Sequence, residues 1–111
     1  MLPRQNRLKD ESDFDRIFKN GRKISTPLFL LAYFYRNDAK PTRIGVVASK
    51  KVGGAVQRNR AKRLLRAASK SIISLHPTGF DYVLLANTST LTNSSTELSS
   101  KICNLLESKS L

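Results

Sequence analysis

The stretch SKKVGGAVQRNRAKRLLRAASK, from Ser49 to Lys70, decides how the rest of the chain must fold. It holds eight Lys or Arg residues, no Asp or Glu, and the adjacent pair Gly53-Gly54. Glycine disfavours a helix interior, so this pair should end one element and let a helix begin after it. We expect that helix to span about Val56 to Leu75, because His76-Pro77 and Gly79 then end it.

A helical wheel divides this helix into two faces. With about 100° per residue and Arg58 as zero, an arc of about 140° carries almost only basic and amide side chains, namely Arg58, Asn59, Lys62, Arg63, Arg66 and Lys70. Arg60 lies on the flank of this arc. The opposite side is apolar and consists of Ala61, Leu64, Leu65, Ala68, Ile72 and Leu75. Ile73 is the one apolar residue that does not fall on this side.

The charges on the basic side are all of one sign. Solvated surface helices usually mix signs, because side chains three or four residues apart then attract each other. Like-charged pairs instead cost roughly 0.2–0.5 kcal/mol each. Bound phosphates would relieve this repulsion, and the planar Arg fork suits bidentate phosphate contact. The pattern therefore favours an anion-binding surface over a merely solvated one.

Outward from this helix, aromatic and β-branched runs predict strands. They fall at 22–25, 28–35, 43–49 and 80–86, and the strand at 43–49 should be antiparallel to that at 28–35 across a turn at 37–41. Phe14, Ile17 and Phe18 predict a short amphipathic helix that Ser12 caps and Asn20-Gly21 ends.

The C-terminal part should be a polar connector followed by a helix. We expect the connector at 87–96 to be mobile, and Ser94 or Ser95 to cap the helix, whose apolar stripe is Leu98, Ile102, Leu105 and Leu106. The element order αβββαβα predicts an α/β domain of the α+β sandwich type, with helices packed on a mixed sheet. A single domain should cover 1–111, with 1–8 as a flexible basic arm.

Composition indicates a polyanionic partner. Twenty basic and eight acidic residues give a net charge of +12, which favours nucleic acid or an anionic membrane surface. The longest apolar run, LFLLAYFY at 28–35, is far shorter than the roughly 20 residues of a spanning helix. The N-terminus lacks a signal-peptide pattern, and the single Cys103 fits a reducing compartment. We therefore expect a cytoplasmic protein without a membrane role.

RNA is the best match among polyanions. GGAVQRNR lacks the spacing of a phosphate-binding loop, and no helix-turn-helix or zinc-ligand pattern favours DNA. Sheet aromatics and Arg planes could stack on unpaired bases. His76 and Cys103 have no catalytic partner nearby in sequence, so we expect no catalytic residue. Phe14 and Phe18 suit either a core or a stacking role, which the residues alone leave open.

The chain resembles the protein subunit of bacterial ribonuclease P. The resemblance rests on Ser49 to Gly53, on Ala55-Val56, and above all on Arg58-Asn59-Arg60 with Lys62, Arg63 and Arg66. It extends to NRLK at 6–9, Phe14, Phe18, Gly21, Arg43 to Gly45, and Asp81 to Val83. It implies a left-handed crossover through Gly53-Gly54, where physics alone would predict a right-handed one.

The resemblance also implies a division of labour. The protein should join a catalytic RNA that, with magnesium ions bound mainly by that RNA, removes the 5′ leader of precursor tRNA. The catalytic RNA should contact Arg58, Asn59, Arg60, Lys62, Arg63 and Arg66, and the single-stranded leader should contact Phe14, Phe18, Lys50 and Lys51. Whether the protein itself binds metal stays open. The alternative is a structural RNA-binding protein of ribosomal type.

The sequence departs from the family pattern at three places. Asn87-Thr88 replaces residues that are usually basic, which puts a cationic leader contact there in doubt. Gly54 and Gln57 occupy positions that are often larger or more apolar. An aromatic residue is often found near Ala32, whereas the nearby Tyr33 and Tyr35 should face the other side of the strand.

Overall fold

The computed structural model describes residues 3–9 and 11–108. Four helices and four strands follow one another, and their order confirms the αβββαβα pattern with one helix divided in two. The elements are α1 (Glu11–Asn20), β1 (Arg22–Ser25), β2 (Phe29–Tyr35), β3 (Arg43–Ala48), α2 (Ala55–Ala68), α3 (Lys70–Leu75), β4 (Phe80–Ala86) and α4 (Ser95–Ser108). Short 3₁₀ turns lie at Arg4–Asn6, Lys50–Val52 and Thr88–Thr92.

The strands form one mixed sheet in the order β1-β2-β4-β3. β2 is antiparallel to β1 and β4, whereas β3 and β4 are parallel. β2 and β3 run in opposite directions as expected, but they are not neighbours, because β4 lies between them. The apolar run of β4, of which five of seven residues are buried, suits this central place.

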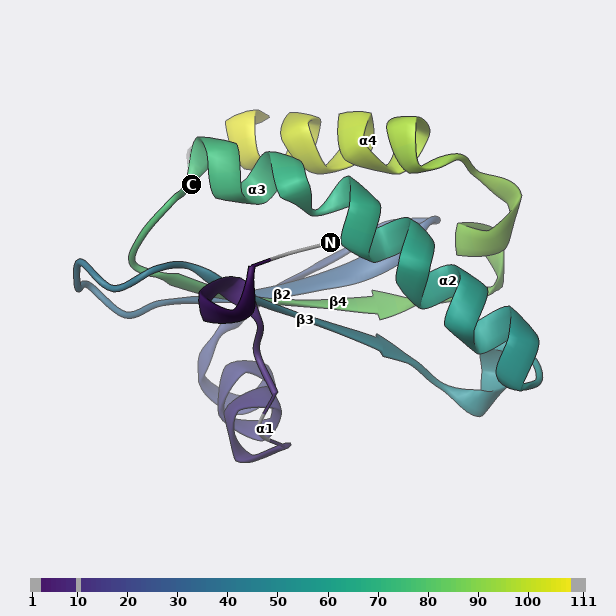
Figure 1. The fold of residues 1–111 in the computed structure, drawn as a ribbon, viewed down its shortest axis with the longest axis horizontal. Coiled ribbons are helices and arrows are strands. Elements are labelled where there is room, and N and C mark those ends of the chain that lie inside the picture. The colour runs from purple at the N-terminus through teal and green to yellow at the C-terminus, as the bar shows by residue number, and fades with distance from the viewer. Residues whose placement is uncertain (1–2, 10, 109–111) are drawn as a thin grey trace.

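The helices cover the two faces of the sheet unequally. Figure 1 shows α2, α3 and α4 above the sheet and α1 below it. The larger core lies on the upper side and contains Phe29, Leu31, Leu65, Tyr82 and Leu84 among its buried residues. The smaller core lies between α1 and the lower face of the sheet and consists of Leu8, Ile17, Ala32 and Val83, with Phe14 and Phe18 packed against it.

The crossover from β3 to β4 is left-handed. In Figure 1, β3 lies in front of β4, and α2 and α3 pass above both strands. The chain turns at Gly53, whose φ of 143° is in a region that L side chains rarely adopt. This confirms the crossover that the resemblance implies.

The predicted long helix is interrupted at Ser69. Its hydroxyl donates to the Arg66 carbonyl, and its own carbonyl accepts from the Ile72 amide, which is a tighter turn than an α-helix makes. Ala61, Leu65, Ala68 and Ile72 are buried as expected. Leu75 is 41% exposed, so its placement on the apolar face was wrong.

Two helix starts can be compared with their predicted caps. Ser94 caps α4: the Glu97 amide donates to the Ser94 hydroxyl, and the Ser94 amide donates to the Glu97 carboxylate. The Ser12 cap was wrong, because α1 already begins at Glu11.

Two segments that were expected to be mobile or flexible make hydrogen bonds to the rest of the fold. In the connector, Thr90 is buried and donates to the Leu28 carbonyl, while Asn87 caps the Thr88–Thr92 turn. In the expected N-terminal arm, Asn6 donates to the Thr42 carbonyl and the Leu8 amide donates to the Ile44 carbonyl. Residues 3–8 therefore lie against β3, and residues 1–2 fall outside the described part.

A buried carboxylate joins α1 to the sheet. Asp81 is 0% exposed and accepts from Arg16 of α1 at 2.9 Å, from Arg36 after β2 at 2.9 Å, and from Arg43 of β3 at 2.9 and 3.0 Å. Burial works to raise the pKa of Asp81, but hydrogen bonds from Arg43 and Arg16 outweigh it and lower this pKa below its usual value. Asp81 is therefore a charged group on which three arginines depend.

We expect Asp81→Asn to destabilise the fold by about 3–5 kcal/mol at neutral pH, because it removes a fully buried carboxylate and leaves three half-buried guanidinium groups without their partner. Because folding lowers the pKa of Asp81, its carboxylate stabilises the fold at any pH above its unfolded pKa near 3.8. This stabilisation is lost as the pH falls below that value and through the lower pKa of the folded state. Urea unfolding at pH 7 and at pH 3 should thus show a smaller difference between the two proteins at pH 3.

Asp38→Asn is the matched control, because Asp38 is exposed where it pairs with Arg36 at 3.3 Å. Its effect should stay below about 1 kcal/mol. An Asp81→Asn protein as stable as wild type at pH 7 would contradict the role given to this carboxylate.

Candidate nucleic-acid interface

The basic side of α2 is a surface of unpaired charge. We call Arg58, Asn59, Arg60, Lys62, Arg63 and Arg66 the basic face. Asn59, Arg60, Arg63 and Arg66 are exposed, and Arg58 and Lys62 are half-buried. Among the residues that the structure describes, every ion pair involves Arg16, Arg36 or Arg43, and none involves a cation of α2. The repulsion expected from the sequence is therefore present in the folded protein.

The opposite side of α2 holds the basic face in place. Ala61, Leu65 and Ala68 are at most 1% exposed and pack into the larger core above the sheet. Lys70, which the wheel put on the same arc, begins α3 beyond the interruption at Ser69. The basic face is thus confined to the fourteen residues of α2.

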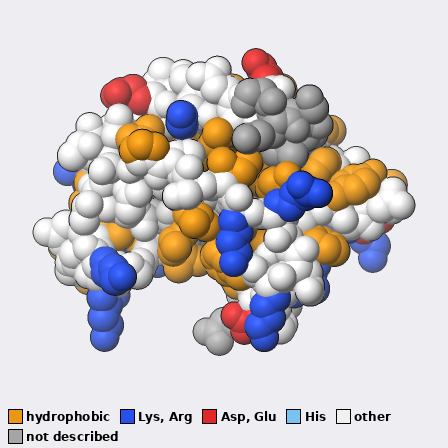
Figure 2. Space-filling model, turned by 180° about the vertical axis from the view of Figure 1, so that it is seen from behind, with side chains coloured by type: hydrophobic (Ala, Val, Ile, Leu, Met, Phe, Trp, Pro, Cys, Tyr) orange, Lys and Arg blue, Asp and Glu red, His pale blue; other side chains and the backbone are white. Residues whose placement is uncertain are grey.

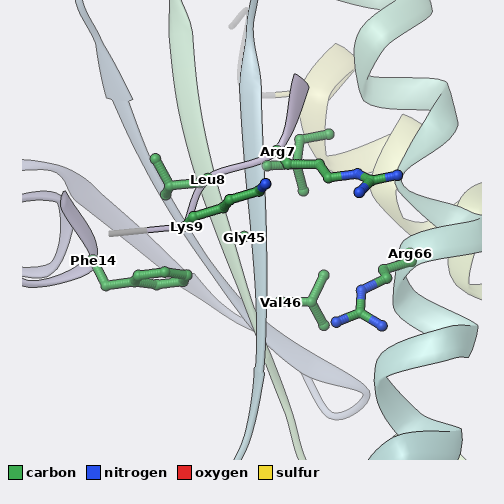
Figure 3. Close-up of a pocket in the computed structure, with 8 residues that line it drawn as sticks. Arg7, Leu8, Lys9, Phe14, Gly45, Val46 and Arg66 are labelled. Atoms are coloured by element: carbon green, nitrogen blue, oxygen red, sulfur yellow. The ribbon is translucent and has the colours of Figure 1, made fainter. Parts of the chain in front are cut away.

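A pocket of about 360 Å³ lies over β3, between the N-terminal segment and α2. We call it the Phe14 pocket; it is lined by Arg7, Leu8, Lys9, Phe14, Ile44, Gly45, Val46 and Arg66. Figure 3 shows Arg66 reaching from α2 toward Val46, with Phe14 entering from α1 on the other side of β3. The lining combines an aromatic ring with cations from two separate elements.

Gly45 allows Phe14 to lie on the strand. A Cβ atom at position 45 would come within 2.5 Å of the Phe14 ring carbons, closer than such atoms approach one another. Phe14 is half-buried, so its ring packs on the smaller core and also borders the pocket. The two readings left open by the sequence, core and stacking platform, are compatible for this residue.

The structure brings only some of the predicted leader residues together. Phe14 lines the pocket with Arg66, which had been assigned to the catalytic RNA. Phe18 lies one turn along α1, outside the pocket lining, where the Lys23 ammonium is 5.8 Å from its ring centroid. Lys50 and Lys51 are exposed in the 3₁₀ turn after β3 and do not line the pocket.

Sequence reasoning gave no role to Arg7 and Lys9, two cations of the pocket. Both belong to the NRLK stretch at 6–9 that carried part of the resemblance, so their positions were noted without a function. What brings Arg7 to the pocket is a parallel bridge between Arg7 and Ile44. Such a pairing between a short terminal segment and a distant strand leaves no periodic signal in the sequence.

The departures from the family pattern have structural explanations at two positions. Asn87 donates to the Pro27 carbonyl and accepts from the Thr90 amide, so it orders a turn. Ala32 is buried under α1, whereas Tyr33 packs toward Tyr82 on the other face of the sheet, as strand alternation predicts.

His76, which was considered for catalysis from the sequence alone, makes contacts that support the fold. His76 Nδ1 lies 2.7 Å from the Tyr82 hydroxyl, and its ring stacks on Phe80 with centroids 4.6 Å apart. Burial raises the pKa of Tyr82, so its hydroxyl stays protonated. Within the described ranges, no three His, Cys, Asp or Glu side chains are grouped closely enough to hold a metal ion.

The same part of the chain contains no helix with the length and apolar character that crossing a membrane requires. The helices are instead amphipathic, and each buries one side against the sheet or another helix.

Comparisons with known proteins agree with this arrangement. The family model described as Ribonuclease P matches residues 2–110. The ribonuclease P protein component of Gluconacetobacter diazotrophicus is 40% identical over 81% of this chain and 78% of its own length. That of Pseudanabaena sp. is 36% identical over 96% of this chain and 92% of its own length.

Solved structures show the same fold. The RNase P protein of Staphylococcus aureus superposes with a TM-score of 0.75 at 26% identity, covering 92% of this chain and 93% of that one. The RNase P protein of Thermotoga maritima gives a TM-score of 0.75 at 28% identity, covering 90% of this chain and 94% of that one. From the family match over nearly its whole length, the chain belongs to the ribonuclease P protein family.

Proposed function

We propose that this chain binds two RNA segments at once, the catalytic RNA on the basic face and the single-stranded 5′ leader of precursor tRNA in the Phe14 pocket. Members of the family are subunits of the ribonuclease P holoenzyme, which processes tRNA 5′ ends, and the chain is such an RNA-binding subunit. The proposal concerns which surface meets which RNA.

The observation that carries the proposal is the unpaired charge of the basic face. No carboxylate in the described part of the chain pairs with it, although the same protein pairs three other arginines with Asp81. Phosphates of a folded RNA supply the missing charge, and Arg can contact each phosphate through two parallel N–H groups. A rigid helix also presents its cations at fixed spacing, which suits a structured partner.

The leader assignment is supported by what lines the Phe14 pocket. Proteins that bind single-stranded RNA combine a cationic groove along the backbone with aromatic rings on which bases stack. The pocket offers the edge or face of Phe14 together with Arg7, Lys9 and Arg66. Its volume of about 360 Å³ lies in the range of small-molecule sites, so a nucleotide unit could enter it.

The chemistry of cleavage belongs to the RNA partner in this proposal. Magnesium bound by that RNA would activate the attacking water and stabilise the leaving oxygen. Within the described residues of this chain, no three His, Cys, Asp or Glu side chains are grouped to hold a metal ion by themselves. The protein contributes binding and orientation, which reduces the entropic cost of placing the substrate.

The direct test of this function is reconstitution. Purified protein, added to a bacterial ribonuclease P RNA at low magnesium concentration, should restore removal of the 5′ leader from precursor tRNA. The protein incubated with substrate and magnesium alone should leave it intact. Lack of any stimulation with the RNA present would argue for a purely structural RNA-binding role.

Removing charge from the basic face should weaken assembly with the RNA subunit. For Arg60→Ala with Arg63→Ala, the slope of log affinity against log salt should fall by up to about one unit per lost phosphate contact. Filter binding at several salt concentrations measures this slope. Arg4→Ala with Lys19→Ala removes the same charge from other exposed positions and is the control; equal effects of the two pairs would contradict a specific RNA contact on α2.

Phe14→Leu should lower the preference of the assembled enzyme for precursor over mature tRNA by about 1–3 kcal/mol, because it removes a stacking ring. Leucine keeps apolar bulk against Gly45, so thermal unfolding should change little. Phe18→Leu is the matched control on the same helix, and we expect a smaller loss since Phe18 does not line the pocket. A folded Phe14→Leu enzyme with unaltered preference would show that the leader lies elsewhere.

Anions should stabilise the free protein by relieving repulsion on the basic face. The melting temperature should rise more with sulfate than with chloride at matched ionic strength. Because sulfate also stabilises proteins by exclusion from their surface, the Arg60→Ala, Arg63→Ala protein serves as reference. An equal sulfate effect on both proteins would mean that the basic face is not a preformed anion site.

A further inference from the structure

A cluster of rings lies at the end of the sheet remote from the Gly53 crossover. Tyr35 ends β2, and its ring centroid is 4.9 Å from that of Phe80 at the start of β4. The Phe80 ring in turn stacks on His76 at 4.6 Å, and His76 directly follows Leu75 of α3. We call Tyr35, Leu75, His76 and Phe80 the aromatic end. Figure 1 shows this end of the strands at the left, with the crossover at the right.

The aromatic end is exposed. Only three large hydrophobic side chains are strongly exposed in the described residues, namely Val56, Tyr35 at 55% and Leu75 at 41%, and Leu75 directly precedes His76 in the chain. The hydroxyl of Tyr35 donates to the side chain of Asn37, itself exposed, so it satisfies no buried group. The exposed ring of Tyr35 continues into the half-buried rings of Phe80 and His76, and a continuous apolar surface of this kind marks an interaction site better than a single side chain does.

The Tyr35 ring is held in a fixed position. It packs against Phe80 and against Gly79, where an added Cβ atom would come 3.1 Å from a ring carbon. Two backbone hydrogen bonds fix this corner: the Arg36 amide donates to the Gly79 carbonyl at 2.7 Å, and the Gly79 amide donates to the Lys40 carbonyl at 2.9 Å. A ring held in this way loses little conformational entropy when a partner stacks on it.

The surrounding charge favours a nucleic-acid partner over an apolar peptide. Arg22 of β1 pairs with Tyr33, so it lies on the same face of the sheet as Tyr35, and it is exposed. Lys40 is exposed beside Gly79, while the nearby Asp38 is paired with Arg36. Figure 2, which views the molecule from behind, shows Lys and Arg side chains among hydrophobic ones at this end.

From the exposed ring and its flanking cations we infer that the aromatic end stacks on an unpaired nucleotide of the RNA subunit. The inference rests on the proposed function in one respect, namely that this chain assembles with that RNA. It adds a contact at the end of the molecule opposite to the start of α2. The longest dimension of the molecule is 37 Å. The RNA would then hold the protein at both ends, which fixes its orientation better than one helix can.

The test compares Tyr35→Leu with Tyr35→Phe in assembly with a ribonuclease P RNA. Leucine keeps an apolar side chain but removes the ring, whereas phenylalanine keeps the ring and removes the hydroxyl. We expect Tyr35→Leu to weaken assembly by about 5-fold to 100-fold and Tyr35→Phe to bind like wild type. The salt dependence should stay unchanged in both, because no phosphate contact is removed.

A second measurement does not depend on a variant. Ultraviolet crosslinking of the wild-type complex, followed by peptide mapping, should join Tyr35 to an RNA nucleotide. Wild-type affinity of Tyr35→Leu together with no crosslink at Tyr35 would overturn the inference. So would a Tyr35→Leu protein whose RNA binding is normal but whose self-association in sedimentation is altered, since the patch would then serve a second protein copy. In either case, the Arg60→Ala, Arg63→Ala result on the basic face still decides the proposed function separately.

Discussion

The ion cluster around Asp81 is the constraint on which the rest of the structure depends. Its carboxylate takes hydrogen bonds from Arg16, Arg36 and Arg43, which come from α1, the end of β2, and β3. A buried charge is stable only when its partners are well placed, so the cluster penalises any other position of α1 on the sheet. That position sets Phe14 over Gly45, and with it one wall of the pocket.

The protein uses arginine in two opposite ways. Around Asp81, three guanidinium groups are balanced by three carboxylates, because Asp13 and Asp38 complete the cluster. Arg16 also lies over the Phe34 ring, 5.1 Å from its centroid, and its pKa is raised by the hydrogen bond to Asp81. On α2, by contrast, no described carboxylate balances the charge. The first set is structural, and the second is available to a partner.

Local patterns predicted much of the fold. The wheel placed the buried residues of α2 correctly and was wrong at Leu75, in α3, while strand alternation put Tyr33 on the opposite face from Ala32. Ser94 was a correct cap because capping depends on residues only three apart. The interruption at Ser69 was not predicted, although its bonds to Arg66 and Ile72 join residues only three apart. A serine hydroxyl can bond back to the preceding turn in a continuous helix as well, so the residue type alone does not mark a break.

Non-local contacts account for what the sequence did not predict. The place of β4 between β2 and β3 depends on pairing between residues 38 to 57 apart, for which one sequence has no periodic signal. The same holds for the Asp81 cluster, whose arginines are 38 to 65 residues away in the chain. The basic face was therefore visible from the sequence, whereas the Phe14 pocket, built from four separate segments, was visible only in part.

Arg66 links the two proposed surfaces. It belongs to the basic face through α2 and to the Phe14 pocket through its side chain, which points toward Val46. A phosphate bound near either surface reduces the repulsion that Arg66 experiences from Lys62 and Arg63. On the proposed assignment, catalytic RNA and leader would therefore share one cation, and each would bind a helix whose charge the other has partly neutralised. Such a shared charge couples the two binding events without any change in fold.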